Sequence, residues 1–169
     1  MNTLIDAAAE FGAEDRTVSG VVAVDVEPTD WHTALGAVLA AGGAYLDALA
    51  GADLADEGLQ VVAHLMTETG NDAVLVRTVV PSANPELQSV GDLWSGATWH
   101  EREITDLYGV TFSDSADDRP LLTDRVGPPP LLKSTLLAAR QDSEWPGSFD
   151  PADKPGAKKR LPPGVADSA

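Results

Sequence analysis

The spacing of hydrophobic and polar residues alternates along the chain between a helical and a strand-like period. Helical segments have apolar residues three and four positions apart, and strand-like segments alternate and are rich in valine. Residues 44–52 are ambiguous, because their alanines favour a helix only by intrinsic propensity. The pattern predicts helices over residues 4–11, from Pro28 to the Gly42-Gly43 pair, from Asn84 to Trp94 and from Trp99 to Tyr108, and strands over residues 18–26, 60–67 and 73–80.

These elements predict an α+β fold, with a small, mainly antiparallel sheet and helices packed on one face. The turn-forming residues 70–72 separate the two clearest strands. From Ser134 onward the apolar period is lost, and five prolines follow. We therefore expect one domain over residues 1–133 and an extended or disordered Pro-rich tail over residues 134–169.

The strong acidity of the chain narrows the possible classes of partner. Its 169 residues include 27 acidic and 11 basic side chains, which give a formal net charge of -16. Residues 1–133 contain 22 of the acidic and 6 of the basic residues, so the excess belongs to the predicted domain. Nucleic acid and anionic membrane surfaces are disfavoured, because both bind through Lys and Arg. Two explanations of the charge stay open, namely solubility and a basic partner subunit.

The absence of cysteine excludes several kinds of site within the chain. Disulfides, Cys-ligated zinc and Cys-ligated iron–sulfur clusters all need this residue. The first residues lack the basic start and apolar core of a signal peptide. No apolar run approaches the ~20 residues that a membrane helix needs. We expect a soluble, cytoplasmic protein.

The segment from Trp99 to Phe112, W-H-E-R-E-I-T-D-L-Y-G-V-T-F, places charged and large apolar residues on two helical turns that stop at Gly109. If the helix is exposed, its best-placed pair, Arg102 with Asp106, contributes only ~0.3–0.5 kcal/mol. If a partner covers the helix, its charges must be fully paired, and Arg102 suits a bidentate contact with a carboxylate. The residues alone are compatible with a capped surface helix and with a charged surface used for assembly.

An enzymatic interpretation finds little support in the spacing of the three histidines. His100-Glu101 resembles the start of a zinc-protease helix, but Ile104 occupies the position of the second histidine. The sequence has no glycine-rich pattern for phosphate or dinucleotide binding. An acidic protein-binding module without a redox role is a further alternative.

The same segment resembles the signature of the C-subunit family of NADH-quinone oxidoreductase (respiratory complex I). This family includes related subunits of membrane-bound nickel–iron hydrogenases and formate hydrogenlyases. It shows a Trp followed by Glu-Arg-Glu, then Asp-Leu/Met-aromatic-Gly and a Phe, and the similarity covers about residues 18–133, with residues 44–52 as a strand. The residues that the resemblance marks as signature or partner interface are Trp99, Glu101, Arg102, Glu103, Asp106, Tyr108, Gly109, Phe112, Arg119 and Lys133.

Beyond Phe112 the chain departs from the family pattern. A pair of arginines in the family is represented by Arg119 alone, and a family Pro-Leu-Arg-Lys is represented by Pro-Leu-Leu-Lys at residues 130–133. These departures leave open an equivalent subunit of a membrane-bound nickel–iron hydrogenase or a formate hydrogenlyase-type complex.

The resemblance implies a cofactor-free, non-catalytic structural subunit in the hydrophilic arm of such a complex. Its implied partners are the hydrogenase-like large subunit and an iron–sulfur subunit, which hold the iron–sulfur clusters and the quinone or nickel–iron site. The chain would reach the inner face of the cell membrane only through the complex, and its tail would wrap the partner. On this view the charged signature residues hold a partner or brace the fold, and Arg119 and Lys133 extend the contact. Exchange of Arg102 for alanine is then expected to impair assembly and leave the domain folded.

Overall fold

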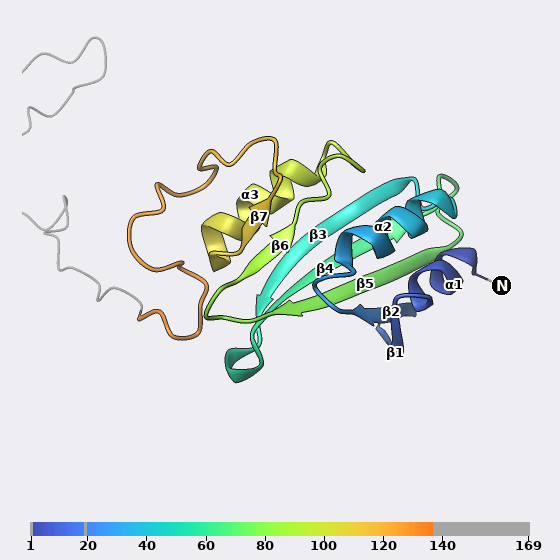
Figure 1. Ribbon diagram of the computed structural model, residues 1–169, viewed down its shortest axis with the longest axis horizontal. Helices are drawn as coiled ribbons and strands as arrows, with labels where there is room; N and C mark the ends of the chain where they lie inside the picture. The colour runs from blue at the N-terminus through green and yellow to red at the C-terminus, as the bar shows by residue number, and fades with distance from the viewer. Residues whose placement is uncertain (1, 19, 137–169) are drawn as a thin grey trace, which may run out of the picture. The chain divides into compact units, whose positions relative to one another are not determined.

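The predicted α+β architecture is present in the part of the chain that the computed structural model describes, residues 2–18 and 20–136 (Figure 1). Helices and strands follow one another in a mixed order along the sequence. In chain order these elements are α1 (Thr3–Ala9), β1 (Gly12–Val18), β2 (Val21–Val26), α2 (Trp31–Ala40), β3 (Tyr45–Asp53), a 3₁₀ turn (Ala55–Glu57), β4 (Leu59–Met66), β5 (Ala73–Val80), β6 (Glu86–Gln88), α3 (Ala97–Tyr108) and β7 (Thr111–Ser113).

The main sheet has five strands in the order β1-β2-β5-β4-β3. Three neighbouring pairs are antiparallel, and β2 pairs with β5 in parallel. The β4–β5 pair keeps an unbroken register from Leu59 opposite Val80 to Met66 opposite Ala73. The prediction of a mainly antiparallel sheet is therefore confirmed, with one parallel pair that the sequence pattern did not indicate.

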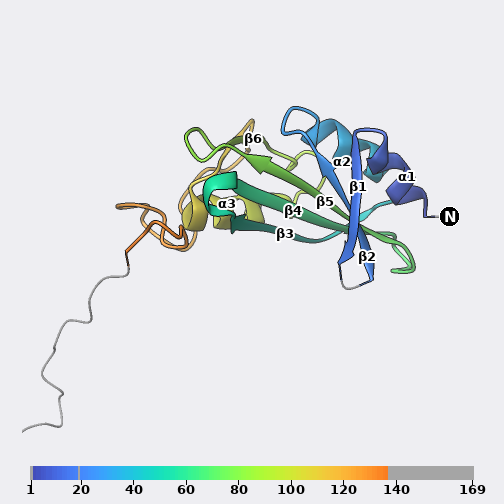
Figure 2. The same ribbon diagram turned by 90° about the horizontal axis from the view of Figure 1, so that it is seen from below.

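One face of this sheet carries the hydrophobic core. Every second residue of β4 and β5 is buried, as expected for strands with one covered face. Trp31 and Leu35 of α2 and Ile104 of α3 belong to the same core. Helices α1 and α2 lie together over one end of the sheet, and α3 lies against β3 toward the other end (Figures 1 and 2). At Gly51 of β3 the approach of α3 is so close that an added Cβ would lie 2.7 Å from the Tyr108 ring.

The N-terminal prediction needs a correction. The segment predicted as one strand over residues 18–26 contains the end of β1, a turn and the whole of β2. Gly20 makes this turn possible, because its φ of +89° lies in the left-handed region that glycine adopts without strain. Residues 44–52 form most of β3, as the resemblance implied, because pairing with β4 outweighs the helical propensity of alanine.

The predicted helix from Asn84 to Trp94 is wrong. Leu87 lies at the centre of the short strand β6, which pairs in parallel with β7. Val90 and Trp94 are buried because a tight turn follows, in which the Trp94 N–H donates to the Val90 carbonyl. The helical spacing of these apolar residues therefore reflects a strand and a turn that both face the core.

Within the described residues no helix is long and apolar enough to cross a bilayer. The predicted tail over residues 134–169 falls almost entirely outside the described residues, which end at Leu136. The domain boundary at residue 133 therefore stays a prediction.

Candidate partner interface around helix α3

On helix α3, three charged side chains of the signature are buried and two other signature residues are exposed to solvent. Glu101, Arg102 and Asp106 are buried, whereas Trp99 and Glu103 are exposed. The helix ends at Gly109, whose φ of +78° forms a left-handed cap and whose N–H donates to the Thr105 carbonyl.

Glu101 joins α3 to the turn after β6. Its carboxylate, which is 1% exposed, accepts hydrogen bonds from the Ser89 hydroxyl at 2.8 and 3.0 Å and from the Val90 N–H at 2.7 Å. Burial raises the pKa of Glu101 above its usual value, and the hydrogen bonds from Val90 and Ser89 offset only part of this effect. Glu101 thus connects α3 to the turn that replaces the predicted helix.

Arg102 binds the chain that follows α3. Its guanidinium donates to the carbonyl oxygens of Arg119 at 2.8 Å and Pro120 at 3.1 Å, and to the Asp117 carboxylate at 3.1 Å. The guanidinium also lies over the Trp99 ring, 5.1 Å from the ring centre, a favourable cation–π distance. The predicted pair of Arg102 with Asp106 is wrong, because each side chain is directed to a different part of the following segment.

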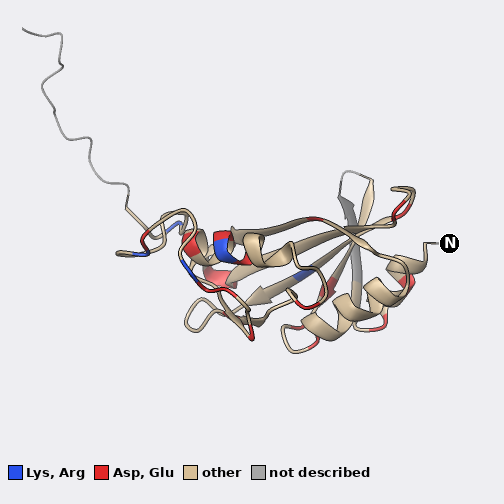
Figure 3. Cartoon of the chain, turned by 90° about the horizontal axis from the view of Figure 1, so that it is seen from above, with Lys and Arg blue, Asp and Glu red and all other residues tan. Residues whose placement is uncertain are grey.

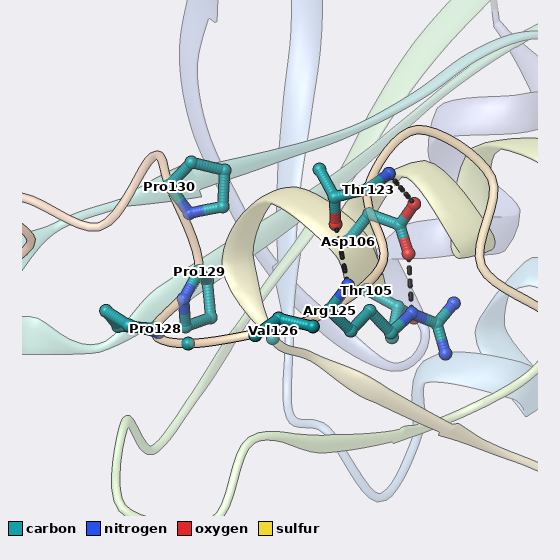
Figure 4. A pocket seen from close by; sticks show the side chains of 10 residues that line it. Thr105, Asp106, Thr123, Arg125, Val126, Pro128, Pro129 and Pro130 are labelled. Carbon is teal, nitrogen blue, oxygen red and sulfur yellow. Dashed lines mark hydrogen bonds and ion pairs between the residues drawn. The ribbon is translucent and has the colours of Figure 1, made fainter.

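Asp106 has the largest set of hydrogen-bond donors in this region. Its Oδ2 accepts from the backbone N–H groups of Leu121 at 2.9 Å, Leu122 at 2.5 Å and Thr123 at 3.1 Å. Its Oδ1 accepts from Arg125 Nε at 2.5 Å (Figure 4). Burial by itself would raise the pKa of Asp106, but these hydrogen bonds outweigh it and hold the pKa well below the usual range.

Residues 114–133, which we call the α3 loop, are therefore fixed to α3 by backbone and side-chain bonds. The Leu131 N–H donates to the Leu107 carbonyl at 3.1 Å, and the Lys133 N–H donates to the Asp53 carboxylate at 2.6 Å. Within the loop, Arg119 makes a bidentate contact with Asp117 at 2.7 and 2.8 Å, which lowers the pKa of Asp117. The loop thus has a defined path along the helix.

The other predicted site residues have different places. Tyr108 is half-buried against β3, and Phe112 is buried in β7. The side chains of Glu103, Arg119 and Lys133 are on the surface, and Lys133 contacts β3 through its backbone N–H. The partner-interface role of these residues stays a prediction.

Sequence reasoning missed Ser89, Asp117 and Arg125, which supply the partners of the buried signature charges. None of them lies on α3, and no periodic pattern relates them to it. A useful signal was available for Arg125, since a buried carboxylate needs a cationic or N–H partner and few basic residues follow α3. The described part of the chain has few Lys and Arg residues, and most of them lie on α3 and the α3 loop (Figure 3).

Two cavities flank the side chains of Thr105 and Arg125. One, of about 350 Å³, lies between the end of α3 and residues 123–130, and the other, of about 290 Å³, extends toward Glu101 and Arg102. Across residues 2–18 and 20–136, no group of three or more His, Cys, Asp or Glu is placed to hold a metal ion. Both cavities are lined by residues of α3 and of the α3 loop.

The domain is similar in fold to two solved structures. One is the trypsin-resistant fragment (1–134) of Nqo5, with a TM-score of 0.60 and 27% identity over 68% of this chain and 95% of that chain. The other is a chain of the membrane-bound sulfane sulfur reductase, an archaeal respiratory membrane complex, with a TM-score of 0.62 and 18% identity over 72% of this chain and 76% of that chain. At this identity the second likeness concerns the fold alone.

Residues 24–141 match the family of the respiratory-chain NADH dehydrogenase 30 kDa subunit, and the chain belongs to this family. Similar proteins include the C subunits of the NADH-quinone oxidoreductases of Vesicomyosocius okutanii, 39% identical over 72 residues, and of Albidiferax ferrireducens, 45% identical over 65 residues. The first match covers 43% of this chain and 35% of the relative, and the second covers 38% and 32%. The matched segment thus spans about a third of the length of these relatives. The resemblance of the signature is confirmed, and the hydrogenase-type alternative is not favoured.

Proposed function

We propose that this chain is a structural subunit of the hydrophilic arm of a complex I-type NADH-quinone oxidoreductase. In this role it packs against the hydrogenase-related large subunit and adjoins an iron–sulfur subunit. The clusters and the quinone site belong to those partners, which carry the electrons. The protein family that residues 24–141 match and the names of the similar proteins support this assignment.

The observation that carries the proposal is the use of the signature charges to fix the α3 loop. Arg102 and Asp106 together bind five backbone groups of residues 119–123. A loop that is ordered before binding loses less conformational entropy on association, so more of the contact energy is available for affinity. The buried charges therefore act indirectly, by preparing a surface for a partner.

Deletion and complementation in the organism that encodes the chain test this proposal. An affinity-tagged chain is expected to co-purify from detergent-solubilised membranes with the other subunits of an NADH-quinone oxidoreductase. Deletion is expected to abolish NADH:quinone activity of the membranes, and a plasmid copy is expected to restore it. A folded tagged chain that retains none of these subunits, together with unchanged activity in the deletion strain, would overturn the proposal.

The cofactor assignment has its own test. The purified chain, freed of its partners, is expected to contain no stoichiometric iron by elemental analysis, while the intact complex contains iron and gives cluster signals in electron paramagnetic resonance. Stoichiometric iron in the isolated chain would contradict the assignment of the clusters to neighbouring subunits.

A further inference from the structure

The cavity of about 350 Å³ at the end of α3 has walls suited to an apolar side chain. Val126, Pro128, Pro129 and Pro130 line it (Figure 4), together with Gly109, which lies close to the Pro129 ring. Val126 is 91% exposed, so its aliphatic side chain is accessible to another molecule. Rigid proline rings and an exposed aliphatic group favour apolar contact over hydrogen bonding.

The polar groups that line this cavity already have partners within the chain. Besides its bond to Asp106, Arg125 donates from Nη1 to the Asp118 carbonyl at 2.7 Å. The Thr105 hydroxyl donates to the Glu101 carbonyl at 2.9 Å, and the Thr123 hydroxyl accepts from the Arg125 N–H at 3.3 Å. A polar small molecule would therefore have to replace existing bonds, whereas an apolar side chain would not.

The charge around the cavity is negative despite the local arginines. Arg119 and Arg125 are paired with carboxylates of the chain, so their charges are largely compensated. Asp118 and Asp124 are exposed, and among the described residues neither carboxylate has a hydrogen-bond or ion-pair partner. Together with the net charge of -16, this attracts a cationic surface and repels an anionic one.

We infer that this cavity receives an apolar side chain from a Lys- or Arg-containing segment of the partner subunit. Two further exposed apolar residues lie on the same elements, namely Leu122 of the α3 loop, which is 58% exposed, and Trp99 of α3, which is 61% exposed. An apolar centre with a charged rim is the usual organisation of a protein–protein contact. The inference rests on the proposed function and adds to it the chemistry of the partner surface.

The apolar part is tested with tagged variants in the deletion strain, by measuring the ratio of NADH-quinone oxidoreductase subunits to tagged chain after purification. Val126→Asn removes the exposed aliphatic wall without adding charge and is expected to lower this ratio about fivefold or more. Tyr45→Asn is the matched control, because Tyr45 is 56% exposed and lies on β3. Its ratio is expected to stay within about twofold of wild type. Equal ratios for the two variants would overturn the assignment of the cavity.

The charge part is tested with two double variants that change the net charge equally. Asp118→Lys with Asp124→Lys is expected to lower the ratio about tenfold at low salt, with a smaller loss at high salt because salt screens exposed charges. The control, Glu10→Lys with Glu68→Lys, alters exposed residues near the other end of the sheet and is expected to retain the complex. Equal losses in both double variants would contradict a basic partner segment.

Two further measurements keep the outcomes distinct. Urea unfolding of each purified variant, with a midpoint equal to that of the wild type, shows that a lower ratio reflects docking and not misfolding. Failure of the wild-type chain to retain any subunit of the complex would refute the proposed function itself. Retention by the wild type and by Val126→Asn alike would refute only the cavity inference.

Discussion

Exchange of Asp106 for asparagine is expected to release the α3 loop and destabilise the domain. The carboxylate is 2% exposed, and it accepts three backbone N–H groups and the Arg125 guanidinium. Hydrogen bonds to a charged group contribute about 1.5–3 kcal/mol each, whereas neutral ones contribute about 0.5–1.5 kcal/mol. Loss of one member of a buried ion pair costs about 3–5 kcal/mol. Asparagine keeps one oxygen acceptor and the Arg125 side chain retains some solvent contact, so we expect a loss of about 2–4 kcal/mol.

The assay is urea unfolding of the full chain, followed by tryptophan fluorescence and circular dichroism, with amide hydrogen exchange of residues 121–123. The variant is expected to unfold at lower urea concentration and to exchange these amides faster. Asp124→Asn is the control, since this exposed aspartate of the same loop has no described side-chain partner. An unchanged urea midpoint with unchanged exchange at residues 121–123 would refute the structural role of Asp106.

The pH dependence gives an independent check of this role. Because the folded-state pKa of Asp106 lies below its ordinary value of 3.8, its contribution to stability is complete above about pH 4. It is lost as the pH falls toward the folded-state pKa. The difference in unfolding free energy between wild type and Asp106→Asn should therefore shrink below about pH 4. A difference in unfolding free energy that stays constant as the pH falls below 4 would contradict the conclusion that the ionised Asp106 side chain stabilises the fold.

Three further substitutions test other contacts of α3, and a fourth, in α2, serves as a control. Burial raises the pKa of Glu101 above its ordinary value of 4.5, so the stabilisation by this side chain is present below pH 4.5 and is lost as the pH rises through the folded-state pKa. At pH 7, Glu101→Gln should therefore unfold at the same urea concentration as wild type or at a higher one. Gly51→Leu should lower the unfolding free energy by about 1–3 kcal/mol, because the leucine side chain would collide with α3. Its control is Gly36→Ala, which adds a methyl group in open space and should leave the unfolding free energy unchanged or raise it. Gly109→Ala should cost about 1 kcal/mol or more, since its φ is +78° and a Cβ would lie 2.8 Å from Pro129 Cγ; equal melting temperatures for this variant and wild type would exclude strain there.

The sequence was sufficient to predict those elements in which local pattern and tertiary burial agree. The β4–β5 hairpin and α3 are of this kind, because the spacing of their apolar residues matches the spacing of the residues that are buried on one face of each element. The predicted helix after Asn84 failed for a physical reason, since Leu87, Val90 and Trp94 face the core from a strand and a turn at spacing that imitates a helix. Strand β1 was missed because its charged segment lacks a clear apolar alternation.

The site shows the same division between local and non-local information. The helix, its Gly109 stop and the identity of its charged residues follow from the sequence. Their partners do not, because Arg102 and Asp106 bind residues 15 to 19 positions away through a loop without periodicity. Neighbouring charges on a helix favour each other by only a few tenths of a kcal/mol, so backbone groups and Arg125 displace that pairing once the loop folds back.

The parallel pairing of β2 with β5 has a consequence for the order of events during synthesis on the ribosome. Val22 of β2 lies opposite Val74 of β5, so the two strands meet only after the intervening residues have left the exit tunnel. Until then the β1–β2 hairpin exposes an unpaired edge, and β3 with β4 lacks its central neighbour. Arrival of β5 joins both halves of the sheet. Helix α3 and its loop follow later in the chain, so the surface proposed for the partner can form only on a completed sheet.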